Sequence, residues 1–141
     1  MDHWPLVMDE IEAGANLIRD LKHYAPIKVA FWLRADDESY RHLYISSDHF
    51  DRAKRPQAYG EVARIIQERP SLFLEPSQVT LISGEDRFAG TALQIHEKSP
   101  GRLGNRLRSE RFGDRYIADA YIYPSPIPDE SPRFQNKVDL I

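Results

Sequence analysis

The stretch from residue 27 to residue 47 limits the possible folds most, because its apolar residues alternate with the period of a β-strand. The alternating set comprises Ile27, Val29, Phe31 and Leu33 before a polar cluster at 36–39, and Leu43 and Ile45 after it. Since successive strand residues point to opposite faces, the pattern predicts an antiparallel hairpin with one apolar face. We expect that face to pack against helices, and we expect Trp32 and Tyr44 on the outer face.

Helical spacings of three and four surround this hairpin. They predict helices over residues 5–22, from about residue 55 to just before Pro70, and from an N-cap at Ser83 to about Lys98. Shorter strands are predicted at 78–83, around 103–111 and at 115–123. In the connection between the second helix and the third strand, we expect Leu72, Phe73 and Leu74 to anchor the chain in the core.

The resulting order α-β-β-α-β-α-β-β predicts an α+β fold. We expect a largely antiparallel sheet of about five strands, with about three helices packed on one face. A length of 141 residues fits one domain, which we place at residues 1–123. Residues 124–141 form a predicted C-terminal tail, because prolines at 124, 126, 128 and 132 oppose regular structure.

Composition excludes several classes of chemistry. The chain has no cysteine, which rules out disulfides, thiolate nucleophiles and cysteine-bound metals and fits a cytoplasmic location. Its net charge of −3 gives no overall attraction for nucleic acid. No apolar run approaches the roughly 20 residues that span a bilayer, so we expect no membrane association.

Residues 98–115 are locally basic. Six basic and two acidic residues give this segment a net charge of +4 on a chain that is acidic overall. Arginine side chains and glycine N–H groups are typical of phosphate and nucleic-acid sites, so the candidates for ligand binding are Arg102, Arg106, Arg108, Arg111 and Arg115. The competing interpretation, which we favour, is a solvated hairpin whose arginines pair with acids elsewhere or in another subunit.

Aromatic residues suggest a second candidate surface. Trp32, Tyr44, Tyr121 and Tyr123 would line the sheet face opposite the helices. Such a face can stack the bases of single-stranded RNA, or it can be covered by the tail or a second copy of the chain. We favour the covered or dimeric face, because apolar sheet faces seldom stay open to water.

Candidates for metal binding or catalysis are few. Asp48, His49 and Asp51 follow a predicted strand, and Asp36, Asp37 and Glu38 occupy the hairpin turn. Both groups suit capping and turn roles, so we expect no metal and no cofactor. The sequence contains no Gly-x-Ser-x-Gly, no phosphate-binding loop of the Walker type and no His-Glu-x-x-His, which favours a non-enzyme.

Three apolar motifs bear on the family of the chain. Phe31-Trp32-Leu33, Leu43-Tyr44-Ile45 and Ala120-Tyr121-Ile122-Tyr123-Pro124 together resemble those of small bacterial proteins of unknown function. The resemblance implies neither an activity nor catalytic residues. The two-sided sheet, the aromatic outer face and the proline-rich tail lead us to expect a protein-interaction domain that forms a homodimer and has a possible protein partner. The alternatives are binding of nucleic acid or a phosphate ligand through 102–115, and a small metal-dependent hydrolase or nuclease.

Overall fold

The computed structural model describes residues 8–35, 40–98, 105–112 and 115–124. The acidic turn, the start of the predicted first helix and the predicted tail beyond residue 124 lie outside the described residues. Within them the order is α1 (Met8–Leu21), β1 (Val29–Ala35), β2 (His42–Ser47), α2 (Arg55–Glu68), the 3-10 helix η1 (Pro76–Gln78), β3 (Val79–Ser83), α3 (Arg87–Lys98), β4 (Asn105–Phe112) and β5 (Arg115–Ile122). The predicted α+β class is confirmed.

The strands form one sheet in the order β3-β2-β1-β5-β4. The pairs β1–β2, β1–β5 and β4–β5 are antiparallel, whereas β2 and β3 are parallel. Strands β2 and β3 can be parallel because α2 connects them and returns the chain to the end of the sheet where β2 begins. The sheet is therefore mixed, with mostly antiparallel pairing.

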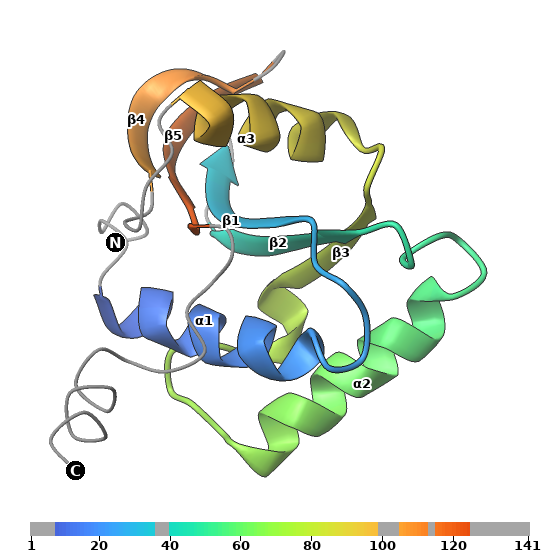
Figure 1. Cartoon of the computed structure of the whole chain (residues 1–141). Helices are drawn as coiled ribbons and strands as arrows, with labels where there is room; N and C mark the ends of the chain where they lie inside the picture. Colours follow the sequence, from blue (N-terminus) through green and yellow to red (C-terminus); the bar gives the residue numbers. More distant parts are fainter. Residues whose placement is uncertain (1–7, 36–39, 99–104, 113–114, 125–141) are drawn as a thin grey trace, which may run out of the picture.

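Helices cover both faces of the sheet (Figure 1). Helices α1 and α2 pack on one face, over a core that includes Leu21, Trp32 and Leu81. Helix α3 packs on the other face, where Ala89 lies in a second core with Phe31. The prediction that all the helices share one face is wrong.

Strand β1 shows why that prediction fails. All of its residues from Val29 to Ala35 are buried, so the strand has no outer face. A strand covered on both sides needs apolar residues at nearly every position rather than at alternate ones. Ala30 and Trp32, between the alternating residues, fill the α1 side, while Val29 and Phe31 fill the α3 side.

The hairpin register separates two aromatic residues that were expected on one face. Phe31 pairs with Tyr44, and Trp32 pairs with Leu43. Trp32 consequently lies on the α1 side, whereas Tyr44 lies on the α3 side and stacks on Phe31 at a ring-centroid distance of 5.2 Å. The prediction of a shared face is wrong, because side chains of facing residues lie on the same side of a sheet and Trp32 faces Leu43 rather than Tyr44.

Aspartates fix the chain ahead of α2 and α3. Asp51 Oδ1 accepts the backbone N–H of Lys54 at 2.9 Å, directly before α2. Asp86 Oδ1 accepts the backbone N–H of Phe88 at 2.8 Å, inside the first turn of α3. The predicted N-cap at Ser83 is wrong, since Ser83 ends β3 and Asp86 takes the capping role.

Candidate functional site

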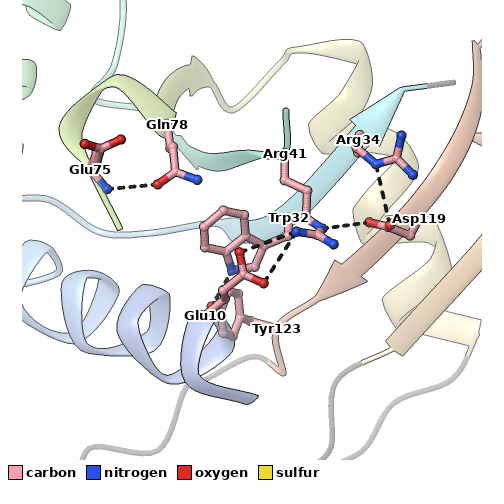
Figure 2. A network of polar contacts seen from close by, with 8 residues as sticks. All are labelled: Glu10, Trp32, Arg34, Arg41, Glu75, Gln78, Asp119 and Tyr123. Carbon is pink, nitrogen blue, oxygen red and sulfur yellow. Dashed lines mark hydrogen bonds and ion pairs between the residues drawn. The ribbon is translucent and has the colours of Figure 1, made fainter. Parts of the chain in front are cut away.

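Trp32 and Tyr123 form a buried polar contact beneath α1, not an outer surface (Figure 2). Trp32 Nε1 donates to Tyr123 Oη at 2.8 Å, and the Tyr123 hydroxyl donates to the backbone oxygen of Ile11 at 2.6 Å. Burial raises the pKa of the Tyr123 phenol well above its ordinary value. Neither ring is open to stacking by a ligand.

The other two predicted stacking residues are partly buried and belong to different faces. Tyr121 meets the ring of Tyr123 edge to face at a centroid distance of 5.1 Å on the α1 side. Tyr44 contacts the rings of Phe31 and Phe88 on the α3 side. The predicted set Trp32, Tyr44, Tyr121 and Tyr123 is therefore split between the two cores and forms no common platform.

The arginine-rich segment lies at one edge of the sheet. Arg106, Arg108 and Arg111 are on β4, and Arg115 begins β5, so the fold brings these four onto one hairpin. Arg102 lies outside the described residues, and for the other four the structure describes the backbone alone. Their predicted role in ligand binding stays a prediction.

The polar junction after β2 has local partners. Asp48 Oδ1 lies 3.8 Å from Lys28 Nζ, and the backbone N–H of His49 donates to Ser47 Oγ at 3.1 Å. Asp51 caps the turn before α2. Within the described part of the chain, no three His, Cys, Asp or Glu side chains are grouped so that they could hold a metal ion.

A row of ion pairs crosses the α1 face near the start of β2 (Figure 2). Arg41 lies 3.4 Å from Glu10 of α1 and 3.3 Å from Asp119 of β5, and Asp119 lies 3.8 Å from Arg34 of β1. The exposed fraction is 10% for the Arg41 side chain and 13% for Asp119. Two guanidinium groups thus balance two carboxylates, and Arg41 links α1 to the sheet.

A hollow of about 580 Å³ lies beside this row. Glu10 and Arg41 line one side of it, and the connection between α2 and β3 lines another. Three large apolar side chains that line it are exposed: Leu72 by 97%, Tyr40 by 71% and Phe73 by 41%. The volume falls in the range of ligand-binding clefts, about 300–1,000 Å³.

Local contacts within the connection that follows α2 keep the side chains of Leu72 and Phe73 at the surface. Ser71 and Leu74 form a β-bridge, and Ser71 Oγ accepts the backbone N–H of Phe73 at 3.0 Å. Leu74 is buried, and the connection continues into η1, where Gln78 Oε1 accepts the backbone N–H of Glu75 at 2.9 Å. The expectation that Leu72 and Phe73 anchor in the core is wrong, because they occupy the centre of a tight turn.

The chemistry of the hollow favours contact with an apolar surface. Arg41 pairs with Asp119 through Nε and with Glu10 through Nη1, while its Nη2 has no hydrogen-bond partner among the described residues. An anionic ligand at Arg41 would still meet the two carboxylates beside it. The exposed apolar side chains gain free energy when another apolar surface removes them from water. The sequence signal for this site was the apolar pair Leu72-Phe73 between Pro70 and Pro76, outside any helical or strand period.

Comparisons with protein-family models, with curated proteins and with solved structures give no match to this chain. Among the described residues, the helices are too short or too polar to cross a membrane. The fold and the hollow are therefore the basis for an assignment of function.

Proposed function

We propose that this chain is a non-enzymatic protein-interaction domain that binds an apolar segment of a partner protein in the hollow beside Arg41. The observation that supports the proposal most directly is the exposure of Leu72, Tyr40 and Phe73 around one concave site. Single exposed apolar residues are common on proteins, but three that line one hollow are typical of an interaction site.

The turn at 71–74 supports this function because its conformation is fixed before any partner arrives. The Ser71–Leu74 bridge and the bond from Phe73 N–H to Ser71 Oγ hold the turn, and buried Leu74 ties it to the core. A preorganised contact loses little conformational entropy on binding. Leu72 and Phe73 would therefore act as the anchors of the interface.

The experiment selects ligands from a displayed library of linear peptides with the whole chain as bait. We expect apolar peptides to be enriched and to bind the double variant Leu72→Ser/Phe73→Ser roughly ten-fold or more weakly than the wild type, as measured by fluorescence polarisation. Leu72 and Phe73 make few core contacts, so the double variant should fold normally.

The matched control is Tyr24→Ser, which removes an exposed aromatic side chain that does not line the hollow. Its affinity for the selected peptides should equal that of the wild type. The proposal is overturned if no peptide is enriched, or if the enriched peptides bind the Leu72→Ser/Phe73→Ser variant as tightly as they bind the wild type.

A further inference from the structure

The hollow beside Arg41 carries an excess of negative charge. With His42 neutral, its charged lining consists of Glu10, Arg41 and Glu75, which are two carboxylates and one guanidinium group. Arg41 is already paired with Glu10 and with Asp119, and the row of ion pairs is balanced within itself. The remaining charge of the lining therefore belongs to Glu75.

Glu75 presents its carboxylate without a cationic partner. The residue is exposed, and within the described part of the chain no lysine, arginine or histidine forms an ion pair with it. Its backbone is held in place, because its N–H donates to Gln78 Oε1 at 2.9 Å and its carbonyl accepts the N–H of Gln78 at 2.9 Å. Figure 2 shows Glu75 on the connection into η1, apart from the ion pairs of Arg41. A cationic group can therefore pair with Glu75 without displacing a described ion pair.

Two aromatic rings line the same hollow as this carboxylate. Tyr40 and Phe73 are both exposed, and Phe73 lies two positions before Glu75 on one connection. The face of an aromatic ring attracts a lysine ammonium or an arginine guanidinium group. The methylene stems of lysine and arginine also bury apolar area against such rings. Rings and a carboxylate in one hollow thus favour a ligand that is both apolar and cationic.

An acidic ligand fits the hollow less well. Its carboxylates would meet those of Glu10 and Glu75 in the lining. The guanidinium group available to it is that of Arg41, which two carboxylates already share. Like charges at an interface disfavour a wrong partner, so the lining selects against acidic segments.

We propose that the partner segment bound in the hollow is basic as well as apolar. A lysine or arginine, close in sequence to the apolar anchor of the segment, pairs with Glu75 and packs its stem along Tyr40 and Phe73. This assignment rests on the proposed function, because it concerns the ligand of the same hollow, and it adds the charge of that ligand. Leu72 and Phe73 supply the apolar contact, whereas Glu75 selects the charge.

The first test changes the charge of Glu75. Displayed peptides selected with the wild-type chain should carry lysine or arginine near an apolar residue more often than the unselected library does. For such a peptide, fluorescence polarisation should give a dissociation constant roughly ten-fold or more higher with Glu75→Lys, and roughly two- to five-fold higher with Glu75→Gln. The matched control Glu85→Lys makes the same change of charge at an exposed residue that does not line the hollow. Its dissociation constant should equal that of the wild type.

The second test exchanges the two charges. Glutamate replaces the lysine or arginine of a selected peptide, which should weaken binding to the wild type and restore binding to Glu75→Lys. Such a recovery requires that the two positions interact, since a misfolded variant cannot gain affinity for the altered peptide. Added salt should also weaken the binding of the original peptide to the wild type more than its binding to Glu75→Gln.

The possible results separate this assignment from the proposed function. Apolar peptides that require Leu72 and Phe73 but bind Glu75→Lys as tightly as the wild type would overturn the basic ligand and leave the interaction domain in place. The absence of any enriched peptide would overturn the interaction domain itself. A wild-type dimer that Glu75→Lys dissociates in sedimentation would place a second copy in the hollow and overturn the assignment to a partner protein.

Discussion

At the scale of single residues, Tyr123 is the polar centre of the core beneath α1. Its hydroxyl accepts from Trp32 and donates to the backbone oxygen of Ile11. We predict that Tyr123→Phe lowers the free energy of unfolding by about 1–3 kcal/mol, because it leaves the buried indole N–H of Trp32 without its acceptor. Urea denaturation measures the change, and Tyr24→Phe at an exposed position should have almost no effect.

The same residue gives a dependence on pH. Burial raises the pKa of Tyr123 in the folded state, so the unfolded chain releases this proton at a lower pH than the folded chain does. The stability that the neutral phenol provides is complete below about pH 10, the ordinary pKa of tyrosine, and is lost as the pH rises further. The stability difference between wild type and Tyr123→Phe should therefore shrink above pH 10; a constant difference would contradict this account.

These residue contacts were beyond prediction from the sequence. Trp32 and Tyr123 are 91 positions apart, and Arg41 is 78 positions from Asp119. Periodicity reports which face of a strand a residue occupies, but not which residue of a distant strand lies beside it. The local pattern did predict the capping role of Asp51, because a cap depends on neighbours in the chain.

At the scale of elements, two helical glycines should respond oppositely to the same substitution. A Cβ atom at buried Gly14 would overlap the Tyr123 hydroxyl and lie 3.1 Å from Trp32 Nε1, whereas a Cβ atom at Gly60 would meet nothing within 4 Å. We predict that Gly14→Ala lowers the free energy of unfolding by about 1–3 kcal/mol, through overpacking. Gly60→Ala should raise it by roughly 0.4–1 kcal/mol, because alanine favours the helix.

Thermal and urea unfolding of both variants provide the comparison. A Gly14→Ala variant as stable as Gly60→Ala would show that α1 can move away from Tyr123 at no cost. A glycine inside a helix is unfavourable unless close packing requires it. The structure shows that close packing applies to Gly14 and not to Gly60.

The link between α1 and the sheet should depend on Arg41. We predict that Arg41→Met lowers the free energy of unfolding by about 2–3 kcal/mol, because Glu10 and Asp119 lose a partner in a largely buried setting. The control is Arg64→Met on α2, where an arginine with a 51% exposed side chain pairs with Glu61 and Glu68. The loss in the control should be much smaller, and salt should reduce it.

Hydrogen exchange of the amides in the first half of α1 gives a second measurement. Exchange should accelerate in Arg41→Met and stay unchanged in Arg64→Met. Equal losses of stability in the two variants would mean that the buried row contributes no more than a surface ion pair.

The strands show where reading elements from the sequence succeeds and where it stops. The alternation from Val29 to Leu33 correctly indicated extended chain, and the bounds of β5 were nearly right. The face assignment failed because β1 is apolar at almost every position, so hydrophobicity could not distinguish its two sides. Without that distinction, the sequence could predict neither the register of the hairpin nor the side of the sheet that α3 covers.

At the scale of the whole molecule, the α+β fold class could be predicted from the order of helices and strands, but the hollow beside Arg41 could not. Tyr40, Arg41, Leu72 and Phe73 come from two separate connections that the fold brings to one end of the sheet. The hollow and β4 belong to opposite ends of the strand order. Glu110→Arg on β4 should therefore leave peptide binding intact.

The hydrogen bond that Tyr59 Oη accepts from the backbone N–H of Leu81 also protects one edge of the sheet. Open-ended strand pairing between copies would need a free edge on each side of the sheet, and at the β3 edge the phenol hydroxyl occupies an amide that an incoming strand would require. Helix α2, which carries Tyr59, thus also protects the sheet against strand addition at β3.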